Sequence, residues 1–333
     1  MKFSDFPLIY EVLSEEDLKP VRVAPNGNLI CVNNDIQKYL LKECGDIEEK
    51  IFSQALPEIE GMNLDFKTLL LPEHLKVVTK NVESEENKEF RKFILINYYD
   101  GTNFNKKWNE ALPDSYGGRG VDLSINDKVA GLLEDFSLID INLLNNLDLL
   151  TFDLRKWIAK NLPFKAEKLI KKRIITKDQA DKARSILESK EVFQGSKMIF
   201  TNGDFYPRNF IELSNGRIVV IDWEGREDYR VSVEFDGIVE DMVGQRNAFI
   251  NYLENHASFF FVHMWGNYKV QRSFLKLAAE KFDLSIINLQ AALIIKSLEQ
   301  ALHFLPWSEY LAVRQAEIFV NSLEKEYVED LLK

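Results

Sequence analysis

The chain has 333 residues, of which 46% are hydrophobic and 29% charged, a composition typical of a globular protein and not of a disordered one. It holds 42 lysines and arginines against 53 acids, which gives a formal net charge of -11 at pH 7. This acidic balance argues against a dedicated nucleic-acid-binding protein, which usually carries a basic excess.

Signals for export, disulfides and membrane insertion are not found in the sequence. Cys31 and Cys44 are the only cysteines, so neither a disulfide framework nor a zinc cluster is expected. The first residues carry acids and lack the basic and apolar regions of a signal peptide. No apolar stretch approaches the roughly 20 residues that span a bilayer. We therefore expect a cytoplasmic protein that binds neither nucleic acid nor a membrane.

The first hundred residues are predicted to form a β-rich unit with one prominent helix. Ser14 and Asp17 have the spacing of a helix-capping box, which predicts a short helix over residues 14–19. An Asn-Gly pair in residues 25–28 predicts a tight turn between two strands. Apolar residues on one face predict a helix over residues 46–56. The predicted strands cover residues 21–24, 29–34, 38–44, 74–82 and 89–99.

Beyond residue 100 the pattern becomes mostly helical. A polar loop extends to about residue 124, and helical periodicity returns after it. The predicted helices cover residues 125–140, 150–162, 176–190 and further segments from about residue 235 to the end. The layout predicts an α+β, bilobal chain with a β-rich N-terminal lobe, residues 1–100, and a mainly helical C-terminal lobe, residues 101–333.

A predicted hairpin interrupts the helices at residues 201–225, TNGDFYPRNFIELSNGRIVVIDWEG. If Asn215 and Gly216 form a two-residue turn, Asn209 lies opposite Asp222, because directly opposed residues share one face of a hairpin. Asp204 lies five residues before Asn209 and can project toward the same point. In this register one apolar face is formed by Ile211, Leu213, Ile218 and Val220.

These three polar residues have the chemistry that phosphoryl transfer needs. Amide and carboxylate oxygens suit Mg²⁺, which also binds water and phosphate oxygens. A further carboxylate can orient an acceptor hydroxyl and take its proton. The alternative is structural, because the D-x-x-x-x-N spacing is common by chance, and Asp204 could simply cap a helix or turn.

The same segment resembles a known family. NGDFYPRN followed by GRIVVIDWE is similar to the catalytic segment of the aminoglycoside phosphotransferase and choline kinase group, which has a protein-kinase-like fold. The resemblance implies that Asp204 is the catalytic residue and that Asn209 and Asp222 bind magnesium. It also implies that Asp236 supports the catalytic loop, although a helix N-cap remains the alternative. Asn202 stands where the family has a histidine, which makes residue 202 the main departure.

The same resemblance implies a nucleotide site in the N-terminal lobe. Lys42, on the predicted third strand, would hold the phosphates of ATP, and Lys38 is the competing lysine. Glu48 or Glu49 would pair with that lysine, although acids in a first helical turn are also favoured by the helix dipole. The single glycine in residues 25–28 makes a poor glycine-rich loop.

Residues 89–99 resemble the hinge strand of the group. Backbone groups of residues 97–99 would meet the adenine edge, with Ile96 or Tyr98 in apolar contact with the base. An ordinary buried strand is the alternative. ATP and GTP are not distinguished by these residues.

The resulting hypothesis is an ATP- and Mg²⁺-dependent kinase for a small-molecule acceptor. No activation segment precedes Asp236, which argues against a protein kinase. Acids after the hairpin favour a cationic acceptor slightly over a neutral one, and these are Glu224, Glu227, Asp228 and Glu234. The rival hypotheses are a kinase-fold module that binds nucleotide without catalysis and a structural scaffold.

A local basic run occurs at residues 165–177, KAEKLIKKRIITK. It could bind an anionic partner. Its apolar residues are spaced as in an amphipathic helix, so a solvent-exposed basic face is the preferred explanation.

Overall fold

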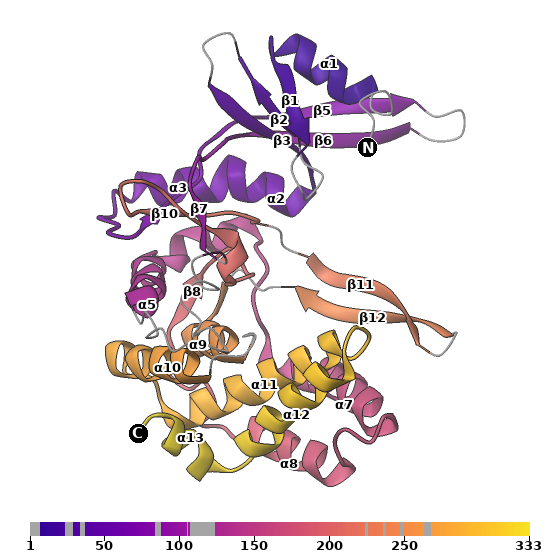
Figure 1. Ribbon diagram of the computed structural model, residues 1–333, viewed down its shortest axis with the longest axis vertical. Coiled ribbons are helices and arrows are strands. Elements are labelled where there is room, and N and C mark those ends of the chain that lie inside the picture. Colours follow the sequence, from indigo (N-terminus) through magenta and orange to yellow (C-terminus); the bar gives the residue numbers. More distant parts are fainter. Residues whose placement is uncertain are drawn as a thin grey trace, which may run out of the picture.

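The protein is described by a computed structural model, which covers residues 7–23, 29–33, 37–83, 88–104, 106, 124–223, 226–235, 238–246, 250–262 and 268–333. It is an α+β protein with an N-terminal antiparallel sheet and a mostly helical remainder (Figure 1). Among the described residues, no helix is both long enough and apolar enough to cross a membrane.

The N-terminal sheet has five antiparallel strands in the order β1-β2-β3-β6-β5. Their bounds are β1 Lys19–Val23, β2 Leu29–Val32, β3 Lys38–Cys44, β5 His74–Glu83 and β6 Lys88–Asn97. Helix α1, Pro7–Glu15, packs Val12 and Leu13 against this sheet. The helix predicted over residues 14–19 is therefore wrong. Ser14 lies in the last turn of α1 instead of capping a new helix, and Asp17 has a left-handed φ of 52°.

A helical stretch follows β3, as the sequence predicts. It consists of α2, Asp46–Lys50, the π-helical turn η2, Ile51–Ala55, and α3, Leu56–Gly61. Its buried residues Ile51, Phe52 and Ala55 pack into the largest hydrophobic cluster of the protein. This contact brings the start of α2, where Glu48 lies, close to the C-terminal half.

A second, four-stranded sheet joins the two halves of the chain. Its order is β4-β10-β9-β7, with bounds β4 Leu69–Leu70, β7 Thr102–Asn103, β9 Phe210–Glu212 and β10 Ile218–Val220. The predicted hairpin supplies the central pair β9-β10, and segments from the first hundred or so residues flank it. The buried carboxylate of Asp135 fixes one edge by accepting hydrogen bonds from the backbone amides of Lys67, Thr68 and Leu69.

Most of the remaining elements are helices (Figure 1). They are α5 Ser124–Ser137, η3 Ile141–Leu147, α6 Leu154–Lys156, η4 Trp157–Asn161, α7 Leu162–Lys171, α8 Lys177–Leu187, η5 Pro207–Asn209, α9 Leu253–Val262, α10 Tyr268–Phe282, α11 Ile286–Phe304, α12 Glu309–Ser322 and α13 Lys325–Leu331. Helix α8 begins with a capping box, since Thr176 and Gln179 bond each other's backbone amides. A short antiparallel pair joins β8, Met198–Phe200, to β13, Ile250–Tyr252.

The helices do not resume at residue 235, so that prediction is wrong. Antiparallel strands β11, Arg226–Phe235, and β12, Ile238–Arg246, come first, and α9 begins at Leu253. The sequence carries a physical reason, because hydrophobic residues alternate with polar ones in YRVSVEF, with the period of a strand.

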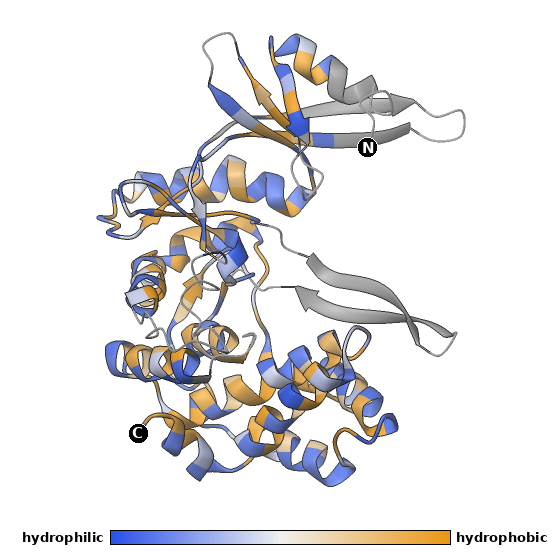
Figure 2. Cartoon of the chain, in the orientation of Figure 1, coloured by the Kyte–Doolittle hydropathy of each residue, from blue (hydrophilic) through white to orange (hydrophobic). Residues whose placement is uncertain are grey.

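Two hydrophobic clusters fill the C-terminal half. One contains Phe210, Ile218, Val220 and Trp223 together with residues of α5, α9 and α10. The other packs α7, α8, α11 and α12 together. Figure 2 shows hydrophobic and hydrophilic residues alternating along these helices, as expected where one face is buried. The hairpin that carries the candidate site belongs to the first cluster.

Candidate active site

The turn of the β9-β10 hairpin differs from the predicted one. Leu213 pairs with Arg217 through an amide–carbonyl bond of 2.9 Å, so the loop has three residues, 214–216. A two-residue type I′ turn requires positive φ at both central residues. Gly216 has φ of 82°, whereas Asn215 is not among the residues with positive φ.

This longer loop shifts the register by one residue. Val220 pairs with Phe210 and Val219 with Ile211. One face therefore carries Phe210, Ile218 and Val220, each fully buried. On the other face Val219 is fully buried as well, whereas its partner Ile211 is only partly buried. The predicted apolar face was wrong on strand β9 because the slip exchanges its two sides.

The predicted pairing of Asn209 with Asp222 is replaced for the same reason. The amide of Ile221 donates to the carbonyl of Asn209 at 2.9 Å. Asp222 comes one residue later, and its φ of 64° turns the chain out of the strand direction. A left-handed non-glycine residue is strained, and such residues are concentrated at functional sites.

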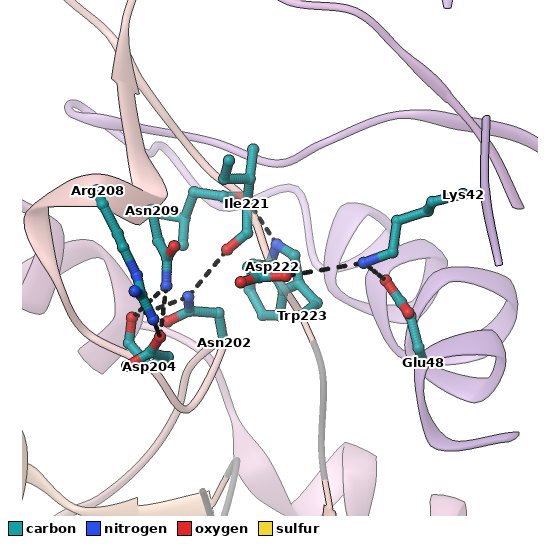
Figure 3. Close-up of polar contacts among 10 residues, drawn as sticks. Lys42, Glu48, Asn202, Asp204, Arg208, Asn209, Ile221, Asp222 and Trp223 are labelled. Atoms are coloured by element: carbon teal, nitrogen blue, oxygen red, sulfur yellow. Dashed lines mark hydrogen bonds and ion pairs between the residues drawn. The ribbon is translucent and has the colours of Figure 1, made fainter. Parts of the chain in front are cut away.

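Asp204 and Asn209 contact each other directly (Figure 3). The Asn209 amide nitrogen donates to the Asp204 carboxylate at 2.9 Å and to its backbone carbonyl at 3.0 Å. Arg208 Nη2 lies 3.3 Å from the same carboxylate oxygen. The Asp204 side chain is 15% exposed, so it is held in place and still reaches solvent. Arg208 was missed in the sequence, although its i+4 spacing from Asp204 was a usable signal.

Asn202 links the two parts of the site. Its side chain is fully buried, and its amide nitrogen donates to the carbonyl of Ile221 at 3.0 Å and to that of Asp204 at 3.2 Å. One side chain thus connects the loop of Asp204 with the residue before Asp222. Asparagine here does what a supporting side chain must do, which is to hydrogen-bond both segments.

Lys42 reaches this hairpin from the N-terminal sheet (Figure 3). Its ammonium lies 2.6 Å from a carboxylate oxygen of Glu48 and 3.7 Å from one of Asp222. The Lys42 and Glu48 side chains are 8% and 5% exposed, whereas that of Asp222 is 35% exposed. The predicted lysine, the acid of the following helix and the hairpin acid therefore meet at one point.

The competing residues lie elsewhere. Lys38 is 43% exposed and pairs with Asp100 at 2.7 Å. Glu49 pairs with Lys92, which also contacts Asp46 at 2.7 Å. These two acids raise the pKa of Lys92 through hydrogen bonds and charge. The geometry thus separates Lys42 from Lys38 and Glu48 from Glu49.

The hinge strand is only partly as expected. Ile96 is buried and Tyr98 is half-buried near the end of β6. The amides of Asn97 and Tyr98 already donate to the carbonyls of Glu73 and Lys38, at 3.1 and 3.0 Å. These two N–H groups are therefore not open to an adenine edge. The expectation for residues 97–99 is thereby limited to their other backbone groups.

A neutral histidine lies behind the loop of Asp204. His256, on α9, is buried, with its Nε2 3.4 Å from the hydroxyl of Thr201 and its ring 5.9 Å from that of Phe205. Burial, together with the charge of Lys296, lowers the pKa of His256 from 6.5 to about 3. His256 is thus an uncharged support at neutral pH.

Oxygen ligands for Mg²⁺ are available around Asp204. Because Asn209 turns its amide nitrogen toward Asp204, its amide oxygen points away from that carboxylate (Figure 3). The partly exposed carboxylate of Asp222 is the second oxygen donor. One carboxylate with one amide fits a cation that keeps water and phosphate ligands. Among the described residues no group of three His, Cys, Asp or Glu forms a self-contained metal site.

Several expectations fall outside the described residues. Asp236, Glu224 and the turn at residues 25–28 are not described. Nor are the side chains of the acids predicted to favour a cationic acceptor, which are Glu227, Asp228 and Glu234.

Comparison with known proteins gives structural matches only. No family model and no curated protein matches the sequence. The GDP complex of aminoglycoside 2'-phosphotransferase-IIIa matches with a TM-score of 0.59 and 12% identity, over 97% of this chain and 98% of that chain. A macrolide 2'-phosphotransferase type I matches with a TM-score of 0.54 and 11% identity, over 95% and 97%. The gentamicin complex of APH(2")-IIa matches with a TM-score of 0.52 and 15% identity, over 94% and 98%. The chain therefore has the fold of the aminoglycoside and macrolide phosphotransferases.

Proposed function

We propose that the protein is a phosphotransferase that moves the γ-phosphoryl group of ATP to a hydroxyl of a small-molecule acceptor. The observation that carries the proposal is the meeting of Lys42, Glu48 and Asp222 after the second strand of a hairpin whose first strand is preceded by the loop of Asp204. A buried lysine, an acid on the next helix and an acid after a hairpin supply what a phosphate-binding site needs.

In this proposal Asp204 is the catalytic residue. The acceptor oxygen forms a bond to the γ-phosphorus while the bond from that phosphorus to the β–γ bridging oxygen breaks, and ADP leaves. The hydroxyl proton passes to the Asp204 carboxylate, which Asn209 and Arg208 orient. Lys42, held by Glu48, binds the phosphates of the nucleotide. Asn209 and Asp222 would hold Mg²⁺, which when bound neutralises charge on the phosphates.

The base of the nucleotide is proposed to lie against the end of β6, with Ile96 and Tyr98 in apolar contact. A streptomycin–ATP complex of APH(2")-IIa and a GDP complex of aminoglycoside 2'-phosphotransferase-IIIa have this fold, so both nucleotides are candidates. The gentamicin and kanamycin complexes of such proteins make a cationic acceptor one candidate. A supply of ATP and two unpaired cysteines fit a place in the cytoplasm.

A nucleotide-binding module without catalysis is the second candidate. It is favoured by Arg208, whose contact at 3.3 Å occupies one oxygen of the proposed catalytic carboxylate. It is also favoured by asparagine at residue 202.

Transfer of labelled γ-phosphate from ATP or GTP, with and without Mg²⁺, tests the proposal. The acceptors are aminoglycosides, macrolides, choline-like amines, sugars and nucleosides. We expect Mg²⁺-dependent transfer to at least one hydroxyl acceptor. Nucleotide and Mg²⁺ that raise the melting temperature without transfer to any acceptor would support the binding module. No thermal effect of any nucleotide would overturn both.

A further inference from the structure

A group of charged side chains, largely shielded from solvent, lies where α7 packs on α11. Lys296 and Glu299 lie one turn apart on α11, with side chains 14% and 16% exposed, and Lys296 Nζ is 3.2 Å from the Glu299 carboxylate. Lys165 belongs to α7, which packs on α11, and is 4% exposed. We call Lys165, Lys296 and Glu299 the buried cationic group. Its position corrects the sequence prediction in part, because the first lysine of the basic run is not on an exposed face.

The Glu299 carboxylate of this group already has two partners. Glu299 accepts a hydrogen bond of 2.9 Å from the indole nitrogen of Trp157, which is fully buried, in addition to the contact with Lys296. Burial acts to raise the pKa of Glu299, but Lys296 and Lys165 hold it below its ordinary value. Glu299 is therefore an anion, and it balances one of the two lysines.

The ammonium of Lys165 has no hydrogen bond or ion pair with any described residue. Burial lowers the pKa of Lys165, an effect that Glu299 opposes. A lysine this deeply buried costs stability unless a partner offsets its desolvation. With two lysines and one glutamate, the group has room for one more negative charge.

Helix α9 lies between this group and the loop of Asp204, and it contacts both. Lys296 Nζ lies 5.7 Å from the ring centroid of Phe259 on α9. One turn earlier on the same helix, His256 contacts Phe205, the residue after Asp204. On the other side, Trp157 begins the π-helical turn η4, Trp157–Asn161, and such turns are frequent at functional sites.

We propose that Lys165 and Lys296 bind a singly charged carboxylate or similar oxyanion carried by the acceptor. This inference rests on the proposed function. It specifies the acceptor of that function as a hydroxylated acid. Glu299 then positions Lys296 and repels more highly charged anions. An acceptor that is only cationic meets the unpaired lysine and binds less well.

The first test locates the anion and needs no acceptor. Crystals soaked in sodium bromide are examined for anomalous density beside Lys165 and Lys296, in the wild type, Lys165→Met and Lys171→Met. Lys171 is the matched control, because it lies on the same helix with its side chain 65% exposed. We expect bromide in the wild type and in Lys171→Met but not in Lys165→Met. Empty density in the wild type, or density that Lys165→Met leaves unchanged, overturns the site.

Stability gives a second readout of Lys165 that separates ligand binding from a structural role. Methionine keeps the length of the side chain and removes the buried charge. We expect Lys165→Met to unfold at equal or higher urea concentration than the wild type. A clear loss of stability would show that Lys165 serves the fold, and it would overturn the proposal.

The third test uses acceptors of one skeleton and different charge, namely glucose, glucuronate and glucosamine. We expect kcat/KM to be highest for glucuronate, and Lys165→Met to lower that value by about ten- to a hundredfold, the loss of one charge-assisted hydrogen bond. Lys171→Met should retain it. A preference for glucosamine that Lys165→Met does not alter contradicts the acceptor class. If none of the three sugars is phosphorylated, the proposed acceptor class is contradicted, the phosphotransferase activity itself is judged with the wider acceptor panel, and the bromide result still decides the anion site.

Discussion

At the residue scale, the Lys42–Glu48 pair is a buried ion pair with a proposed role in binding phosphate. Both side chains are almost fully buried, and Asp222 brings a second carboxylate to 3.7 Å from the same ammonium. Removing one partner of a buried ion pair leaves the other charge uncompensated, whereas removing both can be nearly neutral. The pair can therefore be tested by unfolding alone.

We predict that Lys42→Met lowers the free energy of unfolding by about 3–5 kcal/mol. Glu48→Gln should cost less, because Lys42 keeps Asp222 within 3.7 Å. The double variant Lys42→Met with Glu48→Leu should recover most of the loss. Urea unfolding of the three variants measures these energies. Lys38→Met is the control, since its exposed pair with Asp100 is worth at most about 1 kcal/mol. Equal losses for Lys42→Met and Lys38→Met would contradict the prediction.

Asn202 is the second residue whose role follows from its contacts. In Asn202→Ala the carbonyls of Ile221 and Asp204 lose a buried donor, which costs about 1–3 kcal/mol. We predict that kcat falls between about ten- and a hundredfold through misplacement of Asp204, with little change in the KM for nucleotide. Asn202→His should restore most of kcat. A kcat unchanged in Asn202→Ala would show that residue 202 does not position Asp204.

At the element scale, the hairpin shows how a single extra loop residue changes a predicted site. The strands β9 and β10 and their position in the sequence were predicted, because alternating apolar residues flank an Asn-Gly pair. The register was wrong, since Asn215 does not adopt the positive φ that a two-residue turn needs. Sequence alone cannot decide between these loops, because Asn-Gly fits both of them.

Gly216→Ala tests this turn. The added Cβ would meet no atom within 4 Å, so its cost is that of the positive φ alone, about 1–2 kcal/mol. Gly61→Ala is the matched control, because its Cβ is also unobstructed and its φ is not positive. That change should raise stability by up to about 1 kcal/mol through helix propensity. Urea unfolding gives both values, and a stabilising Gly216→Ala would show that the loop has another conformation.

For the other elements too, the sequence predicts those with a regular local pattern but not the contacts between distant segments. The strand at residues 38–44 and the helix after it were predicted because their apolar spacing is regular. Strand β12 lies where the helices are predicted to return, and strand β11 lies in a segment for which no element is predicted. The convergence of Lys42 on Asp222 joins residues 180 positions apart in the chain. No local pattern contains that contact, and it was reached only through resemblance to a family.

At the scale of the whole molecule, the four-stranded sheet and α9 place the site between the N-terminal sheet and the C-terminal helices (Figure 1). Buried ionisable groups behind the site make the free energy of unfolding depend on pH. His256 is the clearest case, because its pKa in the folded protein is about 3.

We predict that stability falls as the pH is lowered from 6.5 toward 4.5. In that range the unfolded chain binds a proton at His256 and the folded chain does not, so acid favours unfolding. The slope should approach about 1.4 kcal/mol per pH unit once the pH is well below 6.5. Urea unfolding between pH 7 and 4.5 measures it, and His256→Gln should flatten the slope by that amount. A slope that His256→Gln leaves unchanged would contradict the prediction.

The proposed phosphotransferase activity depends most directly on Asp204. The decisive measurement is the rate of phosphoryl transfer to the best acceptor in Asp204→Ala, relative to the wild type and to Asp181→Ala, an exposed acid on α8. The account predicts a fall of about 10²–10⁴-fold for Asp204→Ala, as expected for loss of a general base. Asp181→Ala should retain the wild-type rate, and both variants should keep the wild-type melting temperature within a few degrees. A correctly folded Asp204→Ala that transfers phosphate at nearly the wild-type rate would contradict the account.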